Sequence, residues 1–232
     1  MEEKKILKLL RVRKKHLNKK VSEEKLKIRY CRNFSSTNNE LNYFVVNNNI
    51  AEISFPKERE EETGYIKEHS TDNQDRPSGA RYFIKQGDVS YPRSGKVTPS
   101  YWNKLKRTPD YDKYFRRGHL IASTFGGDKK MSDKSNRGKK SQFIQTKWSN
   151  ENDNGRNPCC QWRFEDIIKK TVKNCSVCID SRPIYRNKAD VIPIGVHLQA
   201  VTKERSLFNV FLPNIDPNIL IDYKKCTFKP KK

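Results

Sequence analysis

One short segment of the sequence combines a base, two cations and flexible glycines in the way that phosphodiester chemistry requires. The segment reads YFRRGHLIASTFGG over residues 114–127 and contains one of only four histidines in the chain. Gly118 lets the backbone bend so that the imidazole of His119 can project from a strand end into a cleft. An imidazole titrates near neutral pH and can act as a general base, while Arg116 and Arg117 can donate hydrogen bonds to phosphate oxygens. Taken alone, Arg-Gly-His is a weak signal, because most histidines are structural.

Short strands and one central helix are expected to position this segment. The segment WRFEDIIKKTV predicts a helix over residues 162–172, with Asn157 at its N-cap and Pro158 at the first helical position. This order of elements indicates an α+β fold with a mixed or antiparallel β-sheet and flanking helices. Apolar and β-branched runs predict the strands, near residues 82–84, 118–122, 142–145, 176–180, 191–202 and 207–212.

The composition indicates one modest core and a polyanionic partner. The 232-residue chain carries 49 Lys and Arg against 27 Asp and Glu, a net charge of +22, and 34% of its residues are hydrophobic. A charge of this size attracts polyanions, because each phosphate contacted releases a condensed counterion. Nucleic acid is therefore the expected partner, although heparin or an anionic membrane surface would suit the same composition.

The chain is expected to divide into three stretches. Residues 1–35 form a basic N-terminal arm or helix, residues 36–80 a hairpin and a charged linker, and residues 81–232 the α+β domain. The hairpin is expected over residues 41–54, where two β-rich segments flank an Asn-rich turn. No apolar run approaches the ~18 residues of a membrane span, and charge interrupts the N-terminus before a secretory signal could form. We therefore expect no membrane partner. The localisation is left open, with an intracellular protein and nuclear import through the basic arm as one alternative.

The cysteines are expected to be core thiols. Cys159, Cys160, Cys175 and Cys178 could be interpreted as a four-sulfur zinc site. Adjacent cysteines rarely both reach one tetrahedral ion, and Cys178 falls within a predicted strand, so ordinary buried thiols are favoured. His197 also falls within a predicted strand and is expected to be structural.

Several blocks in the same order resemble the DNA/RNA non-specific endonucleases, a family of ββα-metal (His-Me finger) nucleases. The matching blocks are RRGHLIA and FGG within residues 116–127, SQFIQ at 141–145, and a helix that carries Glu165 eight residues after Asn157. The segment VTPSYW at 97–102 and the late strands near 183–185 and 208–214 are also similar. The resemblance implies an α+β fold with a ββα-metal catalytic motif in residues 81–232.

The resemblance also implies a Mg²⁺-dependent endonuclease that cleaves DNA, and RNA as a second candidate, with little sequence preference. In this family pattern His119 is the general base that activates water and Arg117 is the motif arginine. Asn157 is the one direct protein ligand of a single Mg²⁺ ion, for which Mn²⁺ is an alternative, and Glu165 orients metal-bound water. A metal held by one neutral ligand keeps open positions for phosphate oxygens and stabilises the leaving oxygen.

The sequence departs from the family pattern at two positions near these residues. Arg116 occupies the position of the usual Asp, and Gln161 stands where a helix Trp is expected, with Trp162 next to it. Trp162 is expected to take the place of that ring through a one-residue adjustment. Arg116 is expected to bind nucleic acid through its own charge, and the resemblance implies the same role for Lys169, one turn beyond Glu165.

The loop before the helix leaves alternatives for the metal ligand. Asn157 is preferred because it keeps the eight-residue interval to Glu165, although its side chain could instead cap the helix. The loop after Gln145 is longer than in the family and supplies three rival ligands, Asn150, Asn152 and Asn154.

Two other functions also stay open. The chain could be a catalytically impaired nuclease fold that only binds nucleic acid, as Arg116 and the longer loop suggest, or an RNA-binding protein unrelated to nucleases. The aromatic residues interleaved with lysines before the motif could stack bases or could belong to the core; they are Trp102, Tyr111, Tyr114 and Phe115.

Overall fold

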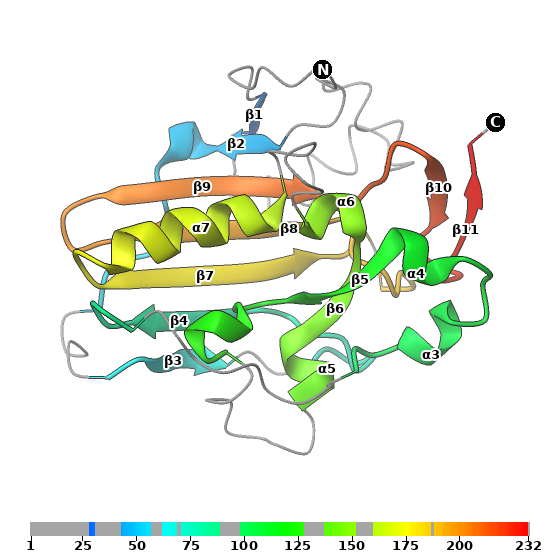
Figure 1. Cartoon of the computed structure of the whole chain (residues 1–232), viewed down its shortest axis with the longest axis horizontal. Coiled ribbons are helices and arrows are strands. Elements are labelled where there is room, and N and C mark those ends of the chain that lie inside the picture. Colours follow the sequence, from blue (N-terminus) through cyan, green and yellow to red (C-terminus); the bar gives the residue numbers. More distant parts are fainter. Residues whose placement is uncertain are drawn as a thin grey trace.

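A seven-stranded antiparallel sheet forms the centre of the computed structural model (Figure 1). The structure describes residues 28–30, 43–56, 62–68, 71–88, 98–127, 137–151, 160–186 and 188–231. The strands are ordered β1 (Ile28–Tyr30), β2 (Phe44–Val46), β9 (Ser206–Pro213), β8 (Gly195–Val201), β7 (Val177–Ile184), β4 (Ala80–Ile84) and β3 (Gly64–Glu68). Every neighbouring pair in this sheet is antiparallel.

Two small antiparallel sheets and several short helices surround the large sheet. The small sheets pair β5 (Phe115–His119) with β6 (Gln142–Thr146) and β10 (Ile219–Asp222) with β11 (Thr227–Pro230). The helices are α3 (Trp102–Leu105), α4 (Tyr111–Tyr114), α5 (Arg137–Ser141), α6 (Lys147–Asn150) and α7 (Gln161–Val172), with 3-10 turns η1 (Asn47–Asn49) and η2 (Ser123–Phe125). No helix in the described ranges is both long and apolar enough to cross a membrane.

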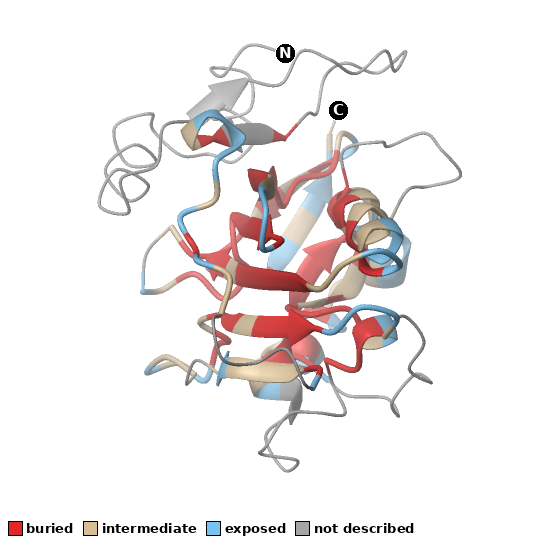
Figure 2. Ribbon diagram, turned by 90° about the vertical axis from the view of Figure 1, so that its left-hand side faces the viewer, coloured by how far each residue is buried: buried red, intermediate tan, exposed pale blue. Residues whose placement is uncertain are grey.

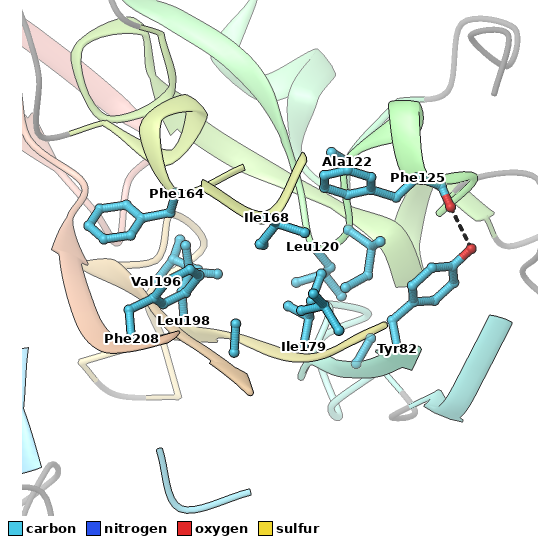
Figure 3. Packing of buried hydrophobic residues seen from close by; sticks show 14 of the residues in the cluster. Tyr82, Leu120, Ala122, Phe125, Phe164, Ile168, Ile179, Val196, Leu198 and Phe208 are labelled. Atoms are coloured by element: carbon cyan, nitrogen blue, oxygen red, sulfur yellow. Dashed lines mark hydrogen bonds between the residues drawn. The ribbon is translucent and has the colours of Figure 1, made fainter. Parts of the chain in front are cut away.

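Helix α7 lies across one face of the large sheet and buries one apolar stripe against it (Figures 1 and 2). Phe164, Ile168 and Val172 recur at i, i+4 and i+8, which places them on the same side of the helix. They join the apolar side chains that β7, β8 and β9 direct to this face (Figure 3). Burying each such side chain contributes about 1.5–3 kcal/mol, so this contact fixes the helix on the sheet.

Helix α7 confirms the predicted helix, but it begins differently. The N-cap is Cys160, which makes no side-chain capping hydrogen bond, and the first helical residue is Gln161. The expected cap residue Asn157 and the expected first residue Pro158 lie outside the described residues. The predicted N-cap position was therefore wrong by three residues.

The predicted strands near 82–84, 142–145, 176–180 and 207–212 are confirmed by β4, β6, β7 and β9. The strand expected over 118–122 was wrong in its bounds: β5 ends at His119, and the chain then turns through η2. The strand expected over 191–202 begins only at Gly195. Its first residues bond elsewhere, since the N–H groups of Val191 and Ile192 both donate to the carbonyl of Tyr223.

The hairpin expected over 41–54 is wrong in its second half. Asn47, Asn48 and Asn49 all have positive φ, as the turn requires, but residues 50–54 form no strand. A side-chain contact takes the place of the second strand of the hairpin: Nδ2 of Asn209 donates to the carbonyl of Ile50 at 2.7 Å. Strand β2 pairs with β1 and β9 instead.

The stretch expected as a linker also contains a strand. Residues 64–68 form β3, which pairs with β4 at one edge of the large sheet. Of the basic arm expected over residues 1–35, only 28–30 lie within the described residues, and they form β1.

A buried amide helps to fasten the β5–β6 pair to the rest of the fold. Asn214, which follows β9, accepts from the backbone N–H of Thr146 at 2.7 Å and donates to the carbonyls of Ile144 and Pro193, both at 2.9 Å. An isolated two-stranded pair is marginally stable at best, so these contacts hold β5 and β6 in place.

Candidate functional site

The strand pair β5–β6 positions the candidate base. His119 is the last residue of β5 and lies opposite Gln142, the first residue of β6. Gly118 precedes it at a point of close packing, where an added Cβ would lie 2.3 Å from Oε1 of Gln145 and 2.8 Å from the ring of Phe143. Glycine is therefore required at position 118, because a larger side chain would not fit between β5 and β6. The close pairing of these strands fixes the position of His119 at the end of β5.

Two side-chain amides hold His119 from different sides. Nε2 of Gln142 lies 2.9 Å from Nε2 of the imidazole, and Nε2 of Gln161 donates to the carbonyl of His119 at 2.7 Å. A hydrogen bond at one ring nitrogen fixes both the orientation of the ring and the tautomer that it adopts. The candidate base is thus pre-oriented by its protein neighbours.

Glu165 lies on α7 beside His119 and shares the second amide. Gln161 donates from the same Nε2 to Oε1 of Glu165 at 3.0 Å, so one amide bridges the helix carboxylate and the backbone of the base. Burial raises the pKa of Glu165, while the Gln161 hydrogen bond and the charge of His119 act in the opposite direction. The Glu165 carboxylate is thus linked through one amide to the backbone of the residue that carries the imidazole.

Arg116 is occupied by protein contacts. Its Nε lies 2.5 Å from Oε1 of Glu151, just after α6, and its Nη1 donates to the carbonyls of Asp112 and, at 2.9 Å, of Phe115. The pocket therefore does contain a carboxylate, that of Glu151, although Arg116 occupies the position of the usual Asp.

Arg117 packs its guanidinium over an aromatic ring. Its Cζ lies 5.3 Å from the ring centroid of Trp102, within the range of a cation–π contact. Its Nε is buried and has no hydrogen-bond partner among the described residues. Trp102 thus holds the guanidinium at the site, and its Nε–H donates no hydrogen bond within the described residues.

These side chains line one open pocket of about 760 Å³. The pocket brings together five of the predicted site residues, His119, Arg116, Arg117, Glu165 and Lys169. Asn157 and the rivals Asn152 and Asn154 lie outside the described residues, whereas Asn150 lines the pocket. Carboxylate and amide oxygens of this kind suit a hard cation such as Mg²⁺. No cluster of three or more His, Cys, Asp or Glu in the described ranges forms a complete metal cage.

The sequence prediction assigned no role in the site to Gln142, Gln161 or Trp162. Gln161 is buried at the position expected for a Trp, and Trp162 is 50% exposed, so the expected one-residue adjustment of the ring was wrong. The helical phase could have shown this, because Trp162 lies two residues from Phe164 and so on the opposite side of α7. Gln142 carried no comparable signal, since its contact depends on the register between β5 and β6.

The remaining expected residues have mainly structural environments. Trp102 and Phe115 are buried core residues, and Tyr111 and Tyr114 pack against the same cluster, although Trp102, Tyr111 and Phe115 also line the pocket. The structural assignment of His197 is confirmed, since the residue is buried in β8 and its Nε2 lies 2.7 Å from Oδ1 of Asn209. The thiols that are buried, as expected, are Cys160, Cys178 and Cys226.

Solved nuclease structures share this fold. NucA from Streptococcus agalactiae with a bound magnesium ion matches with a TM-score of 0.72 and 24% identity, and the match covers 94% of each chain. An extracellular nuclease matches with a TM-score of 0.54 and 19% identity over 78% of this chain and 100% of its own. The Sda1 nuclease with a bound zinc ion matches with a TM-score of 0.54 and 17% identity over 74% of this chain and 80% of its own. No family model and no curated protein matches the sequence. The expected nuclease fold is therefore confirmed: over most of its length the chain shares the fold of NucA and of the extracellular nuclease.

Proposed function

We propose that the protein is a metal-dependent endonuclease that hydrolyses phosphodiester bonds of DNA, with RNA as a second candidate substrate, and with little sequence preference. The observation that carries this proposal is the meeting of His119, Glu165 and three cationic side chains in one pocket. A base, a carboxylate and phosphate-binding cations are the groups that phosphodiester hydrolysis requires. The magnesium-bound NucA structure supports the same chemistry by similarity of fold.

The residues of β5 and α7 take defined roles in this proposal. His119 removes a proton from the attacking water at Nδ1, and the amide of Gln142, rotated so that its oxygen accepts from the imidazole Nε2–H, holds the ring in position for that transfer. Arg117 lines the pocket with its guanidinium held over Trp102, and donates from that guanidinium to a non-bridging phosphate oxygen. Lys169 is exposed at the same pocket and binds a neighbouring phosphate. Arg116 adds positive charge at the pocket, partly balanced by Glu151.

A divalent cation, Mg²⁺ or Mn²⁺, would be held by Asn157 with Glu165 orienting its water ligands. When bound, such an ion polarises the phosphate and stabilises the charge on the leaving oxygen. The oxygen donors of Glu165 and Asn150 at the pocket fit a hard cation of this type.

Cleavage assays on plasmid DNA and on structured RNA test the proposal directly. We expect cleavage with Mg²⁺ or Mn²⁺ and none with EDTA. His119→Ala should slow turnover by roughly 10²- to 10⁴-fold and leave binding nearly intact, because a general base acts on the barrier. A folded wild-type protein that binds nucleic acid but cleaves neither substrate with either ion would overturn the proposal in favour of a binding function.

A matched set of Asn variants tests the metal ligand. Asn157→Ala should abolish the response to Mg²⁺, whereas Asn150→Ala, Asn152→Ala and Asn154→Ala should each be mild. Loss of activity in one of those three, with an active Asn157→Ala protein, would move the ligand to that position.

A further inference from the structure

Helix α7 exposes a large aromatic side chain at the edge of the pocket. Trp162 is 50% exposed, and among the described residues Ile50 is the only other large hydrophobic side chain with comparable exposure. The indole lines the same pocket as His119 and Glu165. An indole left in water beside a reactive histidine offers an apolar face to whatever enters the pocket.

The exposure of Trp162 follows from the phase of the helix. Gln161, Phe164, Ile168 and Val172 are the buried residues of α7. The pocket-lining residues Trp162, Glu165, Asp166 and Lys169 form a stripe next to the buried one, turned from it by roughly a quarter of the helix circumference. The neighbouring buried position is filled by Gln161, whose amide donates to the carbonyl of His119 and to Glu165.

The other two tryptophans are placed differently. Trp102 is buried, and the guanidinium of Arg117 lies over its ring. Trp148 packs against the same core cluster as a partly buried residue. Trp162 is therefore the tryptophan that can present a ring face to a ligand.

Cationic side chains stand beside this ring. Lys106 and Lys169 line the pocket, are exposed, and form no ion pair within the described part of the chain. Sites that bind single-stranded nucleic acid combine such cations, which follow the phosphates, with aromatic rings on which bases stack. A base in a duplex already stacks on both neighbours and cannot offer its face.

We propose that Trp162 is a stacking subsite for an unpaired nucleobase next to the scissile phosphate, and that it makes single-stranded or locally opened nucleic acid the preferred substrate. This inference rests on the proposed nuclease function. The stacking partner is the base itself, whereas Lys106 and Lys169 contact the backbone on either side of it.

The first test compares cleavage of a single-stranded DNA oligonucleotide with cleavage of the corresponding duplex in Mg²⁺. Trp162→Ala should raise KM for the single strand by about 5- to 150-fold, the loss expected for one base–aromatic stack, with kcat little changed. KM for the duplex should stay near the wild-type value, and Trp162→Phe should recover most of the loss. Ile50→Ala removes a similarly exposed apolar side chain that does not line the pocket, and should change neither KM.

The second test measures binding without cleavage, in EDTA. A single-stranded oligonucleotide should quench the tryptophan fluorescence of the wild-type protein and leave that of Trp162→Phe unchanged. An oligonucleotide of equal length with abasic sites should bind more weakly and quench far less. Equal quenching by both probes, or an equal loss of single-strand and duplex cleavage in Trp162→Ala, would overturn the stacking subsite. If the wild type cleaves neither substrate, the nuclease proposal fails, while the quenching experiment still decides whether Trp162 stacks a base.

Discussion

Replacing Gln142 by leucine separates the positioning of His119 from the stability of the fold. Gln142 is buried at the start of β6, and its Nε2 lies 2.9 Å from Nε2 of His119. Its Oε1 is buried without a partner among the described residues. Leucine has a similar volume and removes both the contact with the imidazole and the unpartnered oxygen.

The two effects have opposite signs. Loss of a neutral hydrogen bond of about 0.5–1.5 kcal/mol, at ~1.4 kcal/mol per tenfold, lowers kcat by about 2- to 13-fold if the bond orients the base. Loss of a buried, unpartnered acceptor removes a desolvation cost of about 1–3 kcal/mol. We therefore expect Gln142→Leu to be slower in cleavage and at least as stable as the wild type.

Three measurements check this expectation. Thermal unfolding should give a Tm that is equal or higher, and steady-state kinetics should show the loss in kcat with KM nearly unchanged. In the His119→Ala background the same substitution should have no further effect on kcat, because Gln142 acts through the imidazole. A second, independent loss of rate in that background, or an unchanged kcat in the single variant, would refute the positioning role.

Three further substitutions test the packing of the site. Glu165→Gln should raise the free energy of unfolding in EDTA, because burial raises the pKa of this carboxyl in the folded protein. Ionisation of Glu165 therefore lowers the stability of the wild type as the pH rises from below about 4.5 through the folded pKa. The stability gained by the variant should grow across that pH range, as urea titrations at several pH values would show. Gly118→Ala should lower the stability by about 1–3 kcal/mol, because the added Cβ would collide with Gln145 and Phe143. An unchanged Tm would show that β5 and β6 can shift apart at little cost in stability. Asn214→Ala should cost about 3 kcal/mol or more by leaving three buried backbone groups unpaired, with a parallel loss of cleavage; retention of both would remove its role as a clamp.

Periodicity and local composition were sufficient to predict the regular core elements. The apolar positions Phe164, Ile168 and Val172 define helix α7. Short segments rich in apolar residues, interrupted by polar ones, define β7 and β9, whose residues are nearly all buried. The motif around His119 also identified the strand end at which the pocket lies, although Leu120 to Ala122 continue as a buried turn and not as strand. Apolar patterns in the sequence predict a helix or strand correctly where the residues that form the element also fill the hydrophobic core.

Contacts that depend on register or on distant segments could not be predicted. The return strand expected after Asn49 fails because Asn209, far along the chain, bonds to the backbone of Ile50. The position of Gln142 against His119 is set by the pairing of β5 with β6, which a single sequence does not reveal. Similarly, Gln161 was treated as a departure from a family pattern, whereas its amide joins the helix carboxylate to the strand that carries the base.

The strand order also determines when the site can assemble during synthesis. Strands β7, β8 and β9 are consecutive and pair locally, while β2 and β4 must pair with β9 and β7 across long stretches of chain. Because long-range pairing must first overcome loop-closure entropy, we expect the β7–β9 unit to form early and the N-terminal strands to dock late. The amide of Asn214 that holds β5 and β6 follows β9, so it is synthesised after both of the strands that it holds. For the proposed nuclease, the pocket would thus stay unassembled until the chain has been synthesised beyond Asn214.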